Sequence, residues 1–129
     1  MKDAVTSDRL TAQAPKDRAA SEVESRRARL VQLSQAIHAD PELAWDEHHA
    51  ASHVADVLAE AGFAVTRAAY GVPTAIEATM GDGDLTVALC AEYDALPGIG
   101  HACGHNVIAA AGVGAALAAK MAGRGDVAV

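Results

Sequence analysis

The sequence has few basic side chains, and this scarcity excludes one class of partner. Ten Lys and Arg stand against 17 Asp and Glu in 129 residues, so the formal net charge is −7. Nucleic-acid binding depends on clustered Lys and Arg that displace counterions from phosphates, which this balance disfavours. We expect no nucleic-acid partner, and a chain of this length is expected to hold one domain at most.

Long apolar runs are also missing. No run approaches the roughly 18 residues that a membrane-spanning helix requires. The start, Met1-Lys2-Asp3, leads into polar sequence rather than into the apolar region of a signal peptide. We therefore predict a cytoplasmic protein with no membrane partner.

Aromatic residues and cysteines are scarce as well. Aromatic side chains make up 3% of the chain and Ala supplies much of the 51% apolar fraction, so we expect a core of small side chains. The two cysteines, Cys90 and Cys103, could pair only with each other, and the cytosol keeps thiols reduced. In this interpretation Cys103 is available as a metal ligand or a nucleophile.

Apolar residues recur with a helical period in three stretches. The first covers residues 17–39. The second begins after Asp46 as a predicted N-cap and stops at Gly62, and the third covers 107–121 after Asn106 as a predicted N-cap. These patterns predict three helices.

A two-residue period and a continuous apolar run indicate strands. Short strands are predicted around 63–65 and 75–80. The sequence Gly81-Asp82-Gly83-Asp84 is a hairpin signal, and the apolar run over 85–91 is typical of a central strand covered on both faces. Residues 126–129 begin what resembles a further strand. The predicted fold class is therefore α/β.

The two ends of the chain divide it into an arm and a structured part. Residues 1–16 show no period and end at Pro15-Lys16, which indicates a disordered arm. Residues 17–129 stop inside a predicted strand, so we expect them to be an incomplete part of a larger domain.

A glycine-rich loop over 92–106 holds the residues best suited to chemistry. It follows a predicted strand and precedes a helix, and so lies at the sheet edge where α/β folds bind ligands. Cys103 and His105 are two residues apart, and an extended backbone points such side chains the same way. A thiolate and an imidazole suit zinc best, and Asp94 could accept the second ring N–H of His105. The alternative is a loop thiol beside a hydrogen-bonded histidine, because a lone Cys-x-His pattern is weak.

One other histidine pair has metal-ligand spacing. His49 and His53 are four residues apart on the second predicted helix. The Glu of a zinc-protease His-Glu-x-x-His helix is absent, because Ala50 follows His49. A solvated helix face is the favoured interpretation of this pair.

Two segments resemble motifs of metallopeptidase family twenty, the aminoacylase, carboxypeptidase G and amidohydrolase group. Its amidohydrolase branch carries an Asp-Ala-Leu-Pro element before a His-Ala-Cys-Gly-His element, found here at 94–97 and 101–105. Glu92-Tyr93-Asp94 is similar to the subgroup of aminobenzoyl-glutamate hydrolases and dipeptidases. His38-Ala39-Asp40-Pro41-Glu42-Leu43 is similar to the family's His-x-x-Pro-Glu-Leu turn.

The resemblance implies a zinc-peptidase-like catalytic domain with helices packed on a mixed sheet, of which residues 17–129 are the N-terminal part. It implies that Cys103 and His105 bind a divalent metal, zinc before Mn or Co, and that Asp94 supports the site. The roles of Glu92 and His101 stay open.

The implied function is metal-dependent hydrolysis of an amide bond in a small-molecule substrate, a dipeptide or an N-acyl amino acid. The family's base is a Glu of a downstream acidic pair, with further His and Glu ligands later, whereas after Asn106 this sequence has Asp126 as its one acidic residue and no His. The alternative is a truncated or degenerate fragment that binds metal weakly or packs against a partner without catalysis. A homo-oligomer of the full-length protein is in keeping with either hypothesis.

Overall fold

The computed structural model describes residues 2–122 and 127–128. Its elements are α1 (Lys2–Ser25), α2 (Arg27–Ala39), α3 (His48–Glu60), β1 (Ala64–Arg67), the 3₁₀ turn η1 (Ala69–Gly71), β2 (Ile76–Thr79), β3 (Leu85–Thr86), α4 (His105–Ala122) and β4 (Val127–Ala128).

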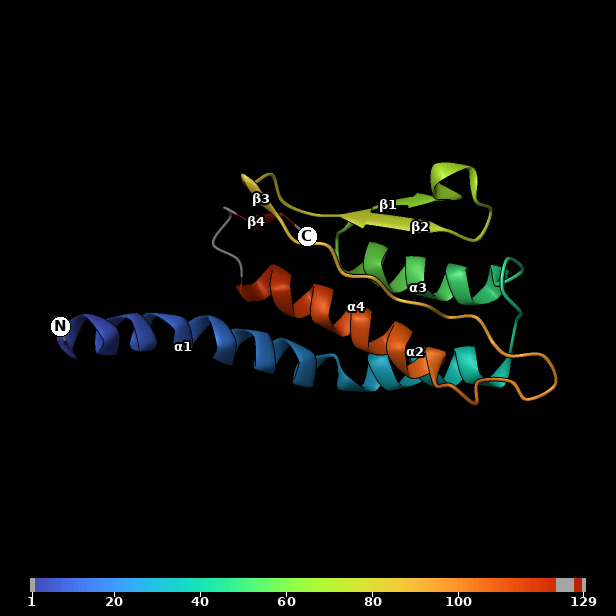
Figure 1. Cartoon of the computed structure of the whole chain (residues 1–129), viewed down its shortest axis with the longest axis horizontal. Coiled ribbons are helices and arrows are strands. Elements are labelled where there is room, and N and C mark those ends of the chain that lie inside the picture. Colours follow the sequence, from blue (N-terminus) through green and yellow to red (C-terminus); the bar gives the residue numbers. More distant parts are fainter. Residues whose placement is uncertain (1, 123–126, 129) are drawn as a thin grey trace.

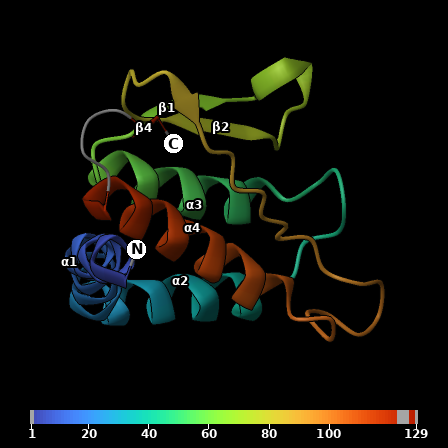
Figure 2. The same cartoon turned by 60° about the vertical axis from the view of Figure 1, so that its left-hand side comes forward.

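The helices form the body of the molecule and the strands lie over one side of it. In Figures 1 and 2, β1 and β2 cover α3, and α4 lies between α3 and the pair formed by α1 and α2. β1 and β2 pair antiparallel, from Ala64 opposite Thr79 to Arg67 opposite Ile76. β3 and β4 form a second, parallel pair. The architecture is α/β, as predicted, with two small sheets in place of the one mixed sheet that the resemblance implies.

The core lies between α2, α3 and α4 and is built largely from small side chains, as the composition predicts. The buried cluster comprises Leu33, Ile37, Ala50, Val54, Val57, Leu58, Ala61, Phe63, Ala109, Val113, Ala116 and Leu117. Two glycines of α4 let neighbouring segments come close. A Cβ at Gly114 would lie 3.1 Å from Leu30 Cδ1, and one at Gly112 would lie 2.8 Å from Ala91 Cβ.

α4 is long and apolar enough to cross a membrane by length and composition alone, contrary to the expectation from the sequence. Its Ala109, Val113 and Leu117 are buried in the core, against the other helices. Only 33% of this helix is buried, however, so packing in the core accounts for part of its apolar composition.

The predicted end of the second helix is confirmed. Gly62 has φ +88°, the left-handed conformation that suits glycine after a helix. The Gly62 N–H donates to Ala59 O at 2.9 Å and the Phe63 N–H donates to Leu58 O at 3.1 Å. The strands β1 and β2 confirm the two-residue period that follows.

The predicted central strand over 85–91 is wrong. Only Leu85 and Thr86 form β3, and residues 85–90, Cys90 included, are exposed. The backbone groups of a strand need hydrogen-bond partners on a neighbouring strand. Within the described residues, β4 provides only two paired residues, Val127 and Ala128. The hairpin predicted at 81–84 is also wrong, because β2 pairs with β1 and β3 pairs with β4.

Three other expectations from the sequence differ from the structure. Residues 2–16, predicted as a disordered arm, belong to α1, which includes Pro15, has Ala as its most frequent residue and contacts α4 through Arg18 Nε and Met121 O at 3.2 Å. The helix predicted over 17–39 is divided at Arg26. Asn106 lies inside α4 and is buried, and its amide donates to Ser34 Oγ at 2.9 Å. The strand predicted over 126–129 is described only at 127–128, as β4.

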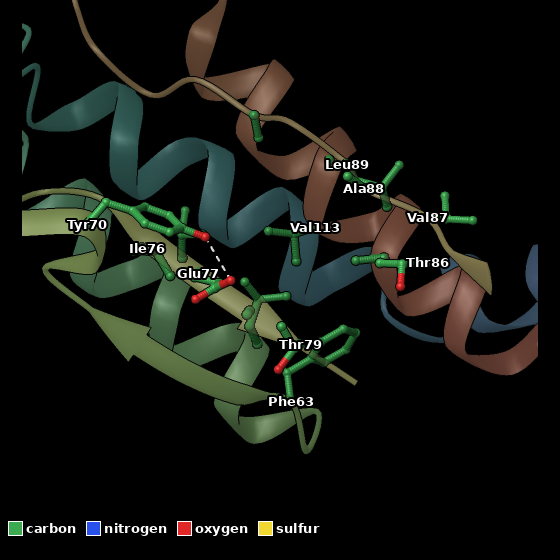
Figure 3. Close-up of a pocket in the computed structure, with 16 residues that line it drawn as sticks. Phe63, Tyr70, Ile76, Glu77, Thr79, Thr86, Val87, Ala88, Leu89 and Val113 are labelled. Carbon is green, nitrogen blue, oxygen red and sulfur yellow. Dashed lines mark hydrogen bonds between the residues drawn. The ribbon is translucent and has the colours of Figure 1, made fainter. Parts of the chain in front are cut away.

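An apolar cavity of about 340 Å³ borders the segment 86–91 (Figure 3). Its walls include Val54, Phe63, Ile76, Val87, Leu89 and Val113. At its edge the Tyr70 hydroxyl donates to Glu77 Oε1 at 2.7 Å. The residues of the 92–106 loop do not line this cavity, so we do not assign it to the candidate site.

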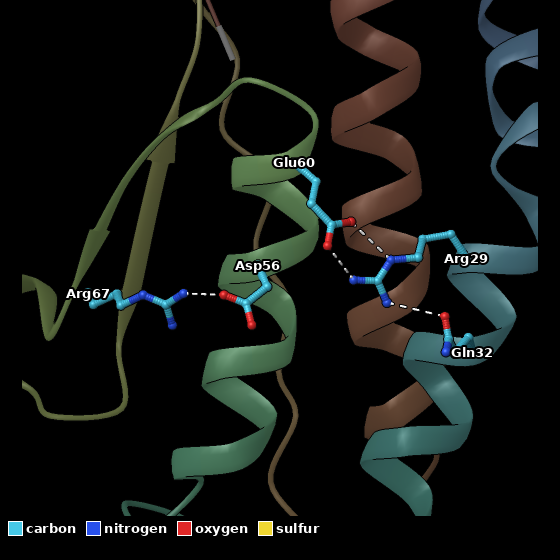
Figure 4. Close-up of polar contacts among 5 residues, drawn as sticks. All are labelled: Arg29, Gln32, Asp56, Glu60 and Arg67. Atoms are coloured by element: carbon cyan, nitrogen blue, oxygen red, sulfur yellow. Dashed lines mark hydrogen bonds and ion pairs between the residues drawn. The ribbon is translucent and has the colours of Figure 1, made fainter.

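Two ion pairs join α3 to its neighbours (Figure 4). Arg29 of α2 makes a two-pronged contact with Glu60, at 3.0 and 3.1 Å, and Arg67 of β1 contacts Asp56. All four side chains are a third or more exposed. Solvent-exposed pairs of this kind contribute roughly 0–1 kcal/mol each.

Candidate metal centre

His105 and Asp94 form the best-defined polar contact in the candidate site. His105 is the first residue of α4, and Asp94 lies in the irregular segment that follows β3. Nδ1 of His105 lies 2.8 Å from Asp94 Oδ1 and 3.0 Å from the Asp94 carbonyl oxygen. Both partners are acceptors, so Nδ1 carries a proton, and in the neutral ring the lone pair is then on Nε2. The predicted contact is confirmed, and Nε2 is the ring atom available to a metal ion.

Cys103 lies in the turn before α4 and its thiol is free and exposed. An exposed sulfur and an imidazole with an open Nε2 are chemically suited to a divalent ion of borderline softness. Among the described residues, however, neither belongs to a cluster of three or more His, Cys, Asp or Glu whose ligand atoms lie within 4.8 Å of one another. Metal binding by Cys103 and His105 therefore stays a prediction.

The turn over 40–43 caps α3, a role that the sequence analysis missed. The Glu42 carboxylate accepts the backbone N–H groups of His49 and Ala50 at 2.9 and 2.8 Å. A carboxylate at the start of a helix accepts hydrogen bonds from backbone N–H groups that have no partner within the helix. Its negative charge also interacts favourably with the positive end of the helix dipole. Asp46, the predicted N-cap, is not the cap, because α3 begins at His48 and Glu42 reaches its first turn from six residues upstream.

A cluster of metal-ligand type does form on the same turn. Ligand atoms of Asp40, Glu42 and His49 all lie within 4.8 Å of one another. His49 Nδ1 is 2.7 Å from Asp40 Oδ2 and 3.5 Å from Glu42 Oε1. The hydrogen bond to Asp40, followed by the charges of Glu42 and Asp40, raises the pKa of His49. Ion pairing and helix capping account for every one of these contacts, so we assign no metal here.

The 40–43 turn also contacts the 92–106 loop. The Ala95 N–H donates to Glu42 O at 2.7 Å, and Leu43 and Ala95 form a parallel β-bridge. Gly100, at φ +60°, lies beside Pro41, so that a Cβ there would be in van der Waals contact with Pro41 Cβ at 3.7 Å. The two segments that resemble family motifs, more than 50 residues apart in the chain, are therefore neighbours in the fold.

The two residues whose roles stay open occupy different environments. Glu92 is exposed. His101 is 8% exposed and neither ring nitrogen has a hydrogen-bond partner among the described residues. Its ring centroid lies 6.1 Å from that of His38, at the end of α2. His101 is thus buried beside α2, whereas Cys103, two residues later, is exposed.

Comparison with known proteins gives the class of the chain: it is homologous to hydrolases that act on amide bonds. Over 118 residues it is 42% identical to the Xaa-Arg dipeptidase of Mus musculus, a match that covers 83% of this chain. Over 115 residues it is 36% identical to one of the polypeptides of the p-aminobenzoyl-glutamate hydrolase of Escherichia coli, covering 76% of this chain. The Xaa-Arg dipeptidase of Homo sapiens is 39% identical over 116 residues.

These relatives confirm the resemblance to the amidohydrolase group of metallopeptidase family twenty. No family model matches the chain. The chain spans about a quarter of the relatives it matches, 27% of the mouse dipeptidase and 24% of the Escherichia coli hydrolase polypeptide.

Proposed function

We propose that this chain is the N-terminal part of a metal-dependent amidohydrolase that cleaves an amide bond in a dipeptide or an N-acyl amino acid. The observation that carries the proposal is the contact of His105 Nδ1 with Asp94, which leaves Nε2 free toward a ligand. The names of the relatives support the substrate class. An Xaa-Arg dipeptide and p-aminobenzoyl-glutamate both contain an amide whose nitrogen belongs to an amino acid.

In this proposal Cys103 and His105 hold a divalent ion, zinc before Mn or Co, and Asp94 keeps His105 in the tautomer that binds. Such an ion polarises a scissile carbonyl and lowers the pKa of water. Asp94 contributes orientation, because its carboxylate and carbonyl oxygens both fix the Nδ1 proton. The general base and the remaining ligands are absent after Asn106, so the chain alone is proposed to bind metal weakly and to catalyse nothing.

Competition for zinc against a chromogenic chelator tests the ligand assignment. We compare the unmodified chain with Cys103→Ser and His105→Ala, and use His49→Ala/His53→Ala as the matched control. Loss of either loop ligand is expected to weaken zinc binding at least about tenfold, the scale at which even outer-shell changes act. The helix variant is expected to retain the affinity of the unmodified chain. Unchanged affinity in both loop variants, with loss in the helix variant, would overturn the assignment.

The second candidate function is a non-catalytic fragment, and the missing base favours it for residues 1–129 taken alone. The two hypotheses differ in what the gene encodes after codon 129. An acidic pair and further His residues there support the enzyme, and their absence supports the fragment. A cytoplasmic location and a homo-oligomer of the longer protein stay predictions.

A further inference from the structure

The backbone around Asp94 is held on both sides. On one side the Ala95 N–H donates to Glu42 O at 2.7 Å. On the other side the Tyr93 hydroxyl donates to the carbonyl oxygen of Thr74, in the connection between η1 and β2. Asp94, the residue that meets His105 Nδ1, therefore lies between two fixed points.

The anchor that receives the Tyr93 hydroxyl is itself buried and hydrogen-bonded. Thr74 is 4% exposed, and its hydroxyl donates to Glu47 Oε2 at 2.8 Å. Glu47 is 8% exposed and directly precedes α3. Burying a polar group without a hydrogen-bond partner is costly in free energy, so a conformation that separates Thr74 from Glu47 is unfavourable. Burial, and then the charge of Glu47, raises the pKa of Tyr93, which keeps its hydroxyl protonated as a donor.

The two anchors differ in how they can be tested. The Ala95 contact uses backbone atoms alone, so only a change to proline, which also restricts the backbone, would remove it. The ring of Tyr93 packs against the core cluster, and its hydroxyl makes the contact with Thr74. Tyr93→Phe therefore keeps the packing and removes one hydrogen bond.

We infer that Tyr93 is a positioning residue for the candidate metal ligand His105. Its hydroxyl, bound to the Thr74 carbonyl, holds residues 93–95 where the carboxylate and carbonyl of Asp94 both accept the Nδ1 proton of His105. Without the hydroxyl, Asp94 is held on one side only, and His105 gains access to its other tautomer. The effect on metal rests on the proposed function, whereas the effect on the tautomer does not.

The test compares Tyr93→Phe with Tyr70→Phe in the chain 1–129. Tyr70 also loses a hydroxyl hydrogen bond, to Glu77 Oε1, but it is 82% exposed and lies outside the loop. Nitrogen-15 NMR of the His105 ring reports the tautomer without any metal, and zinc competition reports affinity. In Tyr93→Phe we expect a mixture of tautomers and about tenfold weaker zinc binding. The unmodified chain and Tyr70→Phe are expected to show Nδ1–H and equal affinity.

The outcomes separate the two proposals. A Tyr93→Phe chain that keeps a pure Nδ1–H signature and the original zinc affinity overturns the positioning role, even where its melting temperature falls. A changed tautomer in a chain that does not bind zinc through Cys103 and His105 supports the positioning role and refutes the proposed function. If Tyr93→Phe does not fold, Tyr93→Met decides by the same readouts, because it also removes the hydroxyl that binds the Thr74 carbonyl and keeps an apolar side chain against the core. A pure Nδ1–H signature in that variant overturns the inference.

Discussion

Replacing Glu42 by Ala is expected to destabilise the chain more than any exposed charge substitution. The side chain is 14% exposed and accepts two amides of the first turn of α3, so its loss leaves both without a partner. A lost N-cap costs about 0.5–2 kcal/mol, and a hydrogen bond to a charged group contributes about 1.5–3 kcal/mol. We therefore expect the free energy of unfolding to fall by about 2 kcal/mol. A chain of this size has only about 5–15 kcal/mol in total.

Urea denaturation measures this loss as a lower midpoint with an unchanged slope. Glu60→Ala is the matched control, because Glu60 is on the same helix and its partner is Arg29 on the surface (Figure 4). Its expected cost is about 0–1 kcal/mol. Glu42→Gln keeps one acceptor oxygen and is expected to fall between the two. If Glu42→Ala costs no more than Glu60→Ala, the carboxylate does not stabilise α3 as described.

Three further predictions concern pH, activity and association. The raised pKa of His49 means that its ion pair stabilises the fold fully below the ordinary histidine pKa of about 6.5. That contribution disappears as pH rises through the higher folded value, so the gap in melting temperature between the chain and His49→Gln should close. A gap that widens with pH would contradict the assignment. The chain 1–129 is expected to show no amidase activity with any divalent metal, and turnover that vanishes in Cys103→Ala would disprove this. The exposed apolar edge at 85–90 should make the chain self-associate in light scattering, and Leu89→Lys should reduce it. A monomeric unmodified chain refutes that reasoning.

Sequence predicted well those features that depend on neighbouring residues. The stop at Gly62 requires only a residue that tolerates a positive φ, and the structure has φ +88° there. The alternation around Val65 and Ala78 likewise shows in β1 and β2. The contact of Asp94 with His105 spans eleven residues, and the tendency of carboxylates to accept the second ring N–H of a metal-binding histidine predicts it.

Features that depend on distant partners could not be predicted in the same way. The apolar run over 85–91 specifies side chains suited to a buried strand but not the neighbours that would bury it. The Glu42 cap and the Tyr93 anchor on Thr74 depend on turns whose path no local pattern reports. The periodicity of apolar residues identifies which face of a helix or strand is apolar. Hydrogen bonds from side chains to distant backbone carbonyls and amides depend instead on the path of the folded chain.

At Gly112, α4 lies very close to the segment that precedes Asp94. The helix carries the imidazole of His105, and about two turns further on it touches Ala91, three residues before Asp94. A Cβ at residue 112 would lie only 2.8 Å from Ala91 Cβ, so one added methyl group must push the two segments apart. The close approach at Gly112 therefore limits the distance between α4, which begins at His105, and the segment that leads to Asp94. A larger side chain at residue 112 is expected to move these two segments apart.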